Sequence, residues 1–370
     1  MKKILIFLSL SILLLSLFGC KGDYEPVEST KEESEVIFTL ELDGERYDIK
    51  YELYRALFLN NKTSVDGGDE TVWQGEGAQE YINKINGIII SSAADIYGAI
   101  HTAEKLGYDA YSKDADKKVK EYITISIEGN GADVIGYESY DKYLEALKDR
   151  NLNYSVSDLL IRYSLALEAI NDYYLGKEDQ ALGNLPGEIS ITEADVRNYY
   201  YSDDCSRVLR AFVGEGVKTR EQIVALHSQI KNAQSDISVA LLIIQNTAAT
   251  AADLLDENDE ISGIVVGRHE LDEIYYSDYI SEAFRIKAGE TSDVIEISAI
   301  NDGISDGYYI LYGIEKDDGH LEKYYEAIKS SYLGNEIGRV LKNTAAGLTE
   351  SIKFTSKYDT ITHSDISMEQ

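Results

Sequence analysis

The hydrophobic periodicity of this 370-residue chain changes twice, which limits the folds that it can form. From 36 to 185 the apolar residues recur mostly at helical spacing, whereas from 205 to 317 short alternating runs lie between short helices. From 318 to 370 a long helical pattern returns before an extended tail. Between the first two parts, Gly183–Gly187 contains one of only two prolines and indicates a domain boundary. A small α/β segment therefore interrupts a mostly helical chain.

Local patterns give the expected order of elements. Residues 36–49 alternate apolar and polar side chains around Asp43-Gly44, which predicts a β-hairpin. In the front part, 36–185, helices are expected over 50–60, 78–106, 113–124, 139–147 and 155–175. After a linking helix within 188–204, the part from 205 to 317 is expected to contain a strand over 207–213, helices over 219–231 and 236–245, a strand over 263–266, a helix over 278–284, and strands over 293–297 and 307–314. A helix over 321–349 and an extended tail over 352–362 complete the chain. The fold class is α+β, a helical domain with an inserted β-α-α-β-α-β-β domain, and the 318–370 segment is expected to pack on the front domain.

The N-terminal residues are typical of an export signal. Lys2 and Lys3 precede the apolar run Ile4–Phe18, and Leu17-Phe18-Gly19-Cys20 has the form of a lipobox. This pattern predicts a signal peptide over 1–19 and a lipid-modified Cys20, which would place the protein on the extracytoplasmic face of the cell membrane. The alternative is a plain secretory signal or a short anchor with a chance cysteine. The acidic, Ser/Thr-containing segment 20–35 is expected to be a solvated tether.

The chain is strongly acidic. It has 35 Lys and Arg against 66 Asp and Glu, a formal net charge of −31. Such a surface repels nucleic acid and anionic lipid, and it is compatible with cationic partners such as basic unfolded chains. With Cys20 lipidated, Cys205 is the only other cysteine and no intrachain disulfide can form, as in many exported proteins of Gram-positive bacteria. The 29 Tyr against 7 Phe favour half-exposed binding surfaces, because tyrosine buries a ring and keeps a polar tip wet.

Four segments resemble one family. Ile191–Tyr200 resembles the helix that leads into the isomerase domain of parvulin-type foldases, and Glu282-Ala283-Phe284, Lys287–Val294 and Asp306–Leu311 resemble later segments of that domain. Together with the lipobox, the helical front part and the long final helix, the chain over about 36–360 resembles exported foldases of the PrsA and SurA type. The resemblance implies a helical chaperone domain, unfolded or partly folded exported proteins as partners, peptidyl-prolyl isomerisation as the family's activity, and no cofactor.

The family's site residues are replaced in this sequence. Its two histidines fall on Arg210 and Tyr309, and its apolar prolyl floor falls on Tyr275 and Tyr279, which with Phe284 are expected to line the substrate groove. The family's Asp or Cys falls within Thr247–Asp253, where the match is poor. The resemblance therefore implies a folding factor with weak or no isomerase activity. Two alternatives stay open: an active isomerase with an altered pocket, and a surface lipoprotein that binds a ligand or partner without a folding role.

Other residue clusters favour structural roles. The five histidines have no metal-ligand spacing. Asp66-Gly67-Gly68-Asp69-Glu70 lacks the order of a calcium loop and is interpreted as a solvated turn, and the acidic residues from Asp253 to Glu260 as an exposed loop. Trp73 is interpreted as a core or groove anchor. Cys205 follows two aspartates, which would raise its thiol pKa and make it unreactive.

Overall fold

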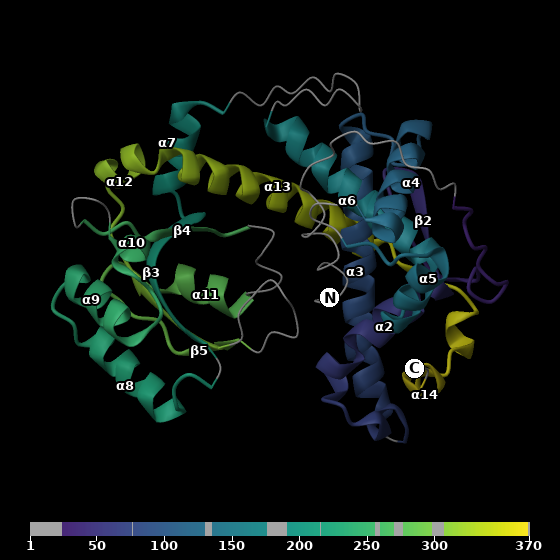
Figure 1. Ribbon diagram of the computed structural model, residues 1–370, viewed down its shortest axis with the longest axis horizontal. Helices are drawn as coiled ribbons and strands as arrows, with labels where there is room; N and C mark the ends of the chain where they lie inside the picture. The colour runs from purple at the N-terminus through teal and green to yellow at the C-terminus, as the bar shows by residue number, and fades with distance from the viewer. Residues whose placement is uncertain are drawn as a thin grey trace. The chain divides into compact units, whose positions relative to one another are not determined.

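The computed structural model describes residues 24–75, 77–129, 135–175, 191–214, 216–255, 260–269, 277–297 and 307–368 (Figure 1). The chain divides into two compact units: unit 1 is Met1–Glu188 with Val340–Gln370, and unit 2 is Ile189–Arg339. The expected signal peptide, Cys20 and Tyr275 lie outside the described residues. Among the helices of the described ranges, none has the length and apolar content needed to span a bilayer.

Unit 1 is mostly helical and carries one small sheet. Its elements are β1 (Val36–Leu42), β2 (Glu45–Lys50), α2 (Tyr51–Asp66), η1 (Glu70–Trp73), α3 (Ala78–Lys105), α4 (Lys113–Glu128), α5 (Tyr140–Asp149), α6 (Tyr154–Leu175), the end of α13 (Tyr325–Glu350), β7 (Lys353–Phe354), η3 (Tyr358–Thr360) and α14 (His363–Met368). The hairpin expected at Asp43-Gly44 is present, and both turn residues have the positive φ that such a tight turn requires, 53° and 86°. The mostly helical character expected for the front part is confirmed.

The sheet of unit 1 includes a strand from the far end of the chain. The strand order is β2-β1-β7, and Phe38 on β1 pairs with Phe354 on β7 at a ring-centroid distance of 5.8 Å. Thr355 then donates its backbone N–H and its hydroxyl to the Ile37 and Val36 carbonyls, at 3.0 Å and 2.6 Å. The final helix α14, which the sequence analysis did not predict, contacts α2 and η1. The C-terminal residues thus complete the core of unit 1.

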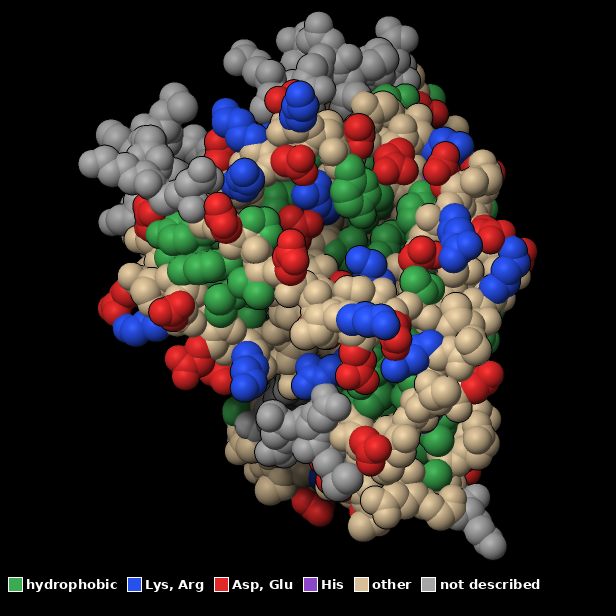
Figure 2. Space-filling view, turned by 90° about the vertical axis from the view of Figure 1, so that its right-hand side faces the viewer, with side chains coloured by type: hydrophobic (Ala, Val, Ile, Leu, Met, Phe, Trp, Pro, Cys, Tyr) green, Lys and Arg blue, Asp and Glu red, His purple; other side chains and the backbone are tan. Residues whose placement is uncertain are grey.

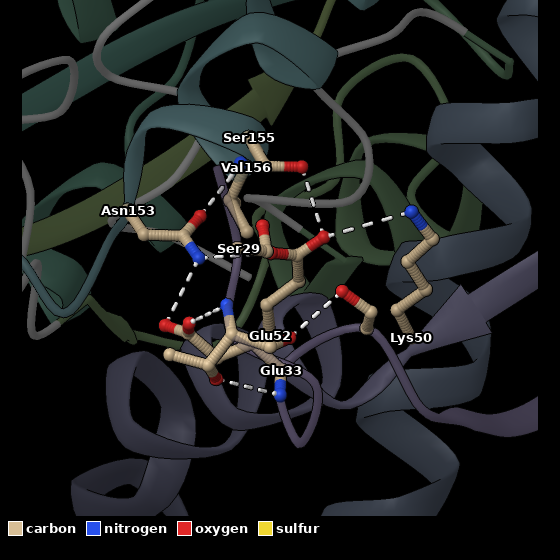
Figure 3. Close-up of polar contacts among 9 residues, drawn as sticks. Ser29, Glu33, Lys50, Glu52, Asn153, Ser155 and Val156 are labelled. Atoms are coloured by element: carbon tan, nitrogen blue, oxygen red, sulfur yellow. Dashed lines mark hydrogen bonds and ion pairs between the residues drawn. The ribbon is translucent and has the colours of Figure 1, made fainter. Parts of the chain in front are cut away.

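Residues 24–35 differ from the solvated tether expected for them, because they are attached to unit 1. The Glu52 carboxylate is buried, and it accepts hydrogen bonds from Ser29, from Asn153 Nδ2 at 2.8 Å and from Ser155 Oγ at 2.9 Å (Figure 3). Asn153 Nδ2 also donates to Glu33 Oε1 at 3.3 Å. A buried carboxylate needs such donors to offset its desolvation, so these groups hold the acidic segment against α2 and α6.

Unit 2 is a small antiparallel sheet between helices. Its elements are α7 (Glu193–Tyr201), β3 (Cys205–Gly214), α8 (Arg220–Lys231), α9 (Asp236–Asn246), α10 (Ala251–Leu254), β4 (Ile264–Gly267), α11 (Ser277–Arg285), β5 (Ile295–Ile297), β6 (Gly307–Gly313), α12 (Asp318–Lys323) and the start of α13. The strand order is β4-β3-β6-β5. With the short α10 added, this is the expected β-α-α-β-α-β-β order, so the chain has the expected α+β fold, a helical part with a small inserted sheet domain.

Side chains of β3 alternate between the two faces of this sheet. Leu209, Ala211 and Val213 pack with α8 and α9, whereas Val208 and Phe212 pack with α11 on the other face (Figure 1). This period of two follows from strand geometry. The face under α11, which also carries position 210, is the one that contains the expected site residues.

The boundary between the units lies within α13 rather than at the expected position 317/318. The expected single helix over 321–349 is two helices, α12 and α13, and the residues up to Arg339 belong to unit 2. Leu321 and Ile328 are buried with Val196 and Tyr200 of α7, which explains why the start of this segment belongs to unit 2. The part of α13 from Val340 onward belongs to unit 1, where Gly98 of α3 lies so close to Ala345 that a Cβ on Gly98 would be 3.4 Å from its backbone nitrogen.

Candidate functional site

The expected site residues that the structure describes lie on or beside the sheet face that α11 covers. Arg210 is on β3, Tyr309 is on β6, and Tyr279 and Phe284 are on α11. Phe212 pairs directly with Tyr309 across the two strands, and Arg210 pairs with Leu311. These residues were grouped by the resemblance, and the backbone places them on or beside one face of the sheet.

An aromatic cluster fills the centre of this face. The rings of Phe212 and Tyr309 are 4.8 Å apart between centroids, and the Tyr279 ring meets Tyr309 edge-to-face at 5.9 Å and 88°. Tyr279 and Tyr309 are only 8% and 6% exposed, so both rings belong to the core under α11. Phe212 was missed by the sequence analysis, although its position two residues after Arg210 on a strand indicates that it shares the same face. We call Phe212, Tyr279 and Tyr309 the aromatic cluster.

Arg210 and Phe284 lie at different edges of this arrangement. Arg210 is exposed and has no acidic partner among the described residues. Phe284 is half-buried, and the Arg268 guanidinium covers its ring at 4.3 Å from the centroid. Arg268 is held there by the Asp203 carbonyl at 2.8 Å and by the Asp204 carboxylate at 3.3 Å. No network joins Arg210 to Tyr309 through the hydrogen bonds of the described residues.

The segment that carried much of the family resemblance, Lys287–Val294, has a structural role. Ser292 is fully buried, and its hydroxyl accepts a hydrogen bond from the Leu311 N–H of β6 at 2.9 Å. Gly289 has a φ of 81° and donates its N–H to the Gly313 carbonyl at 2.9 Å. At Gly313 a Cβ would lie 2.2 Å from the Lys287 carbonyl oxygen, so the two backbones can approach only because this residue is glycine. These residues attach the segment after α11 to β6.

The Thr247–Asp253 segment does not supply the family's Asp or Cys to this face. The Asp253 carboxylate accepts hydrogen bonds from the Thr250 N–H at 2.6 Å and the Thr250 hydroxyl at 2.7 Å, which lowers its pKa and caps α10. The neighbouring Leu254 is buried with Leu209 on the face that α8 and α9 cover. Asp253 is therefore a helix cap on the side of the sheet away from Arg210 and Tyr309.

A second buried polar group lies in unit 2 where β3 meets α12. Arg207 is 5% exposed and donates to Asp317 Oδ2, to the Glu315 carbonyl and to the Ile261 carbonyl, each at 2.7 Å. Asp317 in turn caps α12 by accepting from the His320 N–H at 2.8 Å, and both bonds lower its pKa against the effect of burial. One guanidinium thus joins β3 to two loops.

This geometry gives a matched pair of predictions on one strand. Replacing Arg207 by Met leaves buried carbonyls without donors, and we expect the free energy of unfolding of unit 2 to fall by about 3 kcal/mol. Replacing the exposed Arg210 by Met is expected to change it by less than about 0.5 kcal/mol. Urea unfolding of both variants measures the difference, and equal effects would contradict the role assigned to Arg207.

The remaining candidates have partners that explain them structurally. His101 Nδ1 lies 2.8 Å from the Tyr47 hydroxyl, and His227 Nε2 lies 2.9 Å from the Ser292 carbonyl oxygen. In the expected solvated turn, Asp66 is instead buried, and it accepts from the Trp73 Nε1–H at 2.9 Å and from the Gly68 N–H at 2.8 Å. Trp73 is thus a core residue, 3% exposed. Within the described ranges, no group of three His, Cys, Asp or Glu side chains is arranged to hold a metal ion.

Comparisons with known proteins find similarity only among solved structures. No family model and no curated protein matches the chain. The chain is similar to foldase protein PrsA from Streptococcus pneumoniae, with 14% identity, a TM-score of 0.28, and coverage of 89% of this chain and 98% of the other. It is also similar to PrsA from Lactococcus lactis, with 15% identity, a TM-score of 0.25, and coverage of 90% of this chain and 100% of the other. For PrsA from Bacillus subtilis the identity is 15%, the TM-score is 0.23, and the coverage is 74% of this chain and 87% of the other. The TM-scores and identities are too low for these similarities to assign the fold or the activity of this chain.

Proposed function

We propose that the protein is a membrane-anchored, extracytoplasmic folding factor of the parvulin-type foldase class, with weak or no peptidyl-prolyl isomerase activity. The aromatic cluster is the observation that supports weak or no isomerase activity. It occupies the face on which the resemblance places the prolyl pocket, and its tyrosines are buried. Client binding is assigned to the helical front part and the tyrosine-rich surfaces, and lipid attachment is assigned to Cys20.

The physical cost of prolyl binding at this face supports low activity. Isomerisation needs no nucleophile or metal, but it must lower a rotational barrier of about 18–20 kcal/mol. A proline ring could enter the face only if a buried tyrosine left it, at a cost of roughly 1.5–3 kcal/mol for lost burial and about 0.5–1.5 kcal/mol for each lost ring pair. The cost reduces the binding energy that can stabilise a twisted amide.

We therefore expect the mature protein to isomerise a short proline peptide at a rate near background while it suppresses aggregation of an unfolded client. The double variant Arg210→His with Tyr309→His is expected to raise the rate only slightly, because Tyr279 and Phe212 still fill the face. A protease-coupled peptide assay and light scattering of a chemically unfolded client measure the two activities.

Two results would change the assignment. Robust wild-type turnover that falls sharply in Tyr309→Ala or Tyr279→Ala would establish an active isomerase with an altered pocket. If the protein neither suppresses aggregation nor isomerises the peptide above background, the remaining hypothesis is a surface lipoprotein that binds a ligand or partner without a folding role. A lipid-free Cys20 in the mature protein, detected by the mass of its N-terminal peptide, would refute the anchoring part alone.

A further inference from the structure

We propose that unit 1 docks on the neutral interfacial region of the bilayer through a tyrosine patch beside the anchor. The patch consists of the half-buried rings of Tyr24, Tyr137 and Tyr140 and of Ile135, which is 99% exposed. This inference rests on the proposed lipid attachment at Cys20. It goes beyond that attachment because it assigns a particular protein surface to the membrane.

The first described residue after the proposed anchor is already fixed to the folded unit. The Tyr24 hydroxyl donates to Glu128 Oε1 of α4 at 3.0 Å, and the Tyr24 ring lies 5.3 Å from the Tyr140 ring of α5. The Tyr140 hydroxyl donates to the Glu25 carbonyl at 2.7 Å. Residues 29–35 are held further along by the Glu52 contacts (Figure 3). The described part of the expected tether, residues 24–35, is therefore attached to unit 1.

The remaining spacer is short. Three residues separate Cys20 from Tyr24. Because each residue spans at most about 3.6 Å, Tyr24 can lie no more than about 14 Å along the chain from Cys20. A lipid on Cys20 would thus hold the tyrosine patch at the surface of the bilayer, whatever path those three residues take.

The patch has the chemistry of a membrane interface and a rigid base. Tyrosine suits the boundary between headgroups and acyl chains because its ring is apolar and its hydroxyl is polar. Tyr140 and Tyr137 lie 6.3 Å and 6.0 Å from the buried Tyr143 ring, whose hydroxyl lies 3.0 Å from Ser157 Oγ. The Tyr137 and Glu138 N–H groups donate to the carbonyls of Ser126 and Ile127 in the last turns of α4, so Ile135 lies two residues before a segment that is attached beside Glu128, the partner of Tyr24.

The charges around the patch select the kind of lipid. Glu25, Glu128, Glu138 and Asp141 carry exposed or partly exposed carboxylates, and Lys142 is paired with Glu138 at 2.5 Å. Figure 2, which views the molecule from the side where Figure 1 shows α4 and α5, has acidic and basic side chains around its hydrophobic ones. Local carboxylates repel anionic headgroups, so docking is expected to be stronger on zwitterionic lipid and to gain from added salt on anionic lipid.

A tryptophan reporter tests the docking. In Ile135→Trp, anchored through its own lipid in phosphatidylcholine vesicles, quenching by brominated lipid should be several-fold stronger than in Val217→Trp, a matched exposed apolar position in unit 2. The parent chain gives the background of Trp73, which is in the core. Adding Tyr24→Ala and Tyr140→Ala, or inserting a 20-residue Gly/Ser linker after Asp23, should remove most of the difference. Replacing the zwitterionic lipid by phosphatidylglycerol at low salt should reduce the difference in quenching between positions 135 and 217.

Equal quenching at positions 135 and 217, or quenching at 135 that survives both the double alanine change and the linker, would overturn the docking proposal. Failure of the anchor itself is distinguished by the mass of the N-terminal peptide. If Cys20 carries no lipid, coupling a maleimide phospholipid to its thiol supplies the same reach, since Cys205 is buried and protected from the reagent. The same quenching comparison then decides whether the patch docks.

Discussion

A chain that ends at Arg339 is expected to lose the cooperative fold of unit 1. It would lack β7, α14 and the last part of α13, including the buried side chains of Leu348 and Ile366. Burial of each of these two contributes about 1.5–3 kcal/mol. The truncation also leaves the β1 edge unpaired and removes His363 and Tyr358, the partners of Tyr54 and Asn86. Together, the lost burial, the lost strand pairing and the lost hydrogen bonds approach the 5–15 kcal/mol that typically separates folded from unfolded domains.

Circular dichroism and hydrogen exchange would measure this effect. We expect the amide protons of α2 and α3 to lose protection, while those of β3 and β6 in unit 2 keep theirs. A chain that ends at Thr362 is the graded control, because it removes α14 but retains β7 and α13. A truncated protein with an unchanged melting temperature would show that the C-terminal residues do not complete unit 1.

The second expected result is a loss of stability in unit 2 as the pH falls from 7.5 to 5. His320 is 5% exposed, and burial together with the Arg207 charge lowers its pKa from 6.5 to about 4. The unfolded chain therefore binds more protons between these two pKa values, and stability falls with pH through that window. Relative to pH 7.5, the loss from this group at pH 5 is roughly 2 kcal/mol, since one pKa unit corresponds to 1.36 kcal/mol.

His320→Phe isolates this contribution. The phenyl ring can keep the stacking that His320 makes with Tyr200, at 5.7 Å and 18°, but it cannot be protonated. The variant should be less stable by about 1 kcal/mol at pH 7.5, because the Tyr200 hydroxyl loses its contact with His320 Nδ1 at 3.0 Å. At pH 5 the difference from wild type should shrink or reverse. Parallel stability curves for the two proteins across this range would show that His320 is not the group responsible.

Local sequence signals were sufficient for most of the elements. Asp43-Gly44 between alternating strands specified the hairpin, and α7, which the structure starts with a capping box of Thr192 and Asp195, lies within the linking helix expected in 188–204. Periodicity over 78–106 predicted α3 to within one residue at its end. Such features depend on neighbours a few residues apart, so one sequence contains the information that they need.

The parts that were missed depend on residues far apart in the chain. The pairing of Phe38 with Phe354 spans more than 300 positions, and the extended tail expected over 352–362 did not indicate which strand it would pair with. The segment 24–35 has a tether-like composition, and its attachment depends on Glu52 being buried beside Asn153, which no local pattern reveals. A resemblance placed the expected site residues, but alternation alone could have added Phe212. The burial of Arg207 could not be predicted from neighbouring residues, because its hydrogen-bond partners come from two loops that are distant in sequence.

The division of unit 1 between the two ends of the chain would set an order of events during the proposed export. A chain that crosses a membrane from its N-terminus delivers the whole of unit 2 before it delivers Val340–Gln370. Unit 2 is continuous in sequence, whereas β1 would have one edge uncovered until β7 arrives. An uncovered strand edge readily pairs with other extended chains. During the proposed export, the protein would thus pass through a stage in which unit 2 is complete while the β1 edge of unit 1 is still open to pairing.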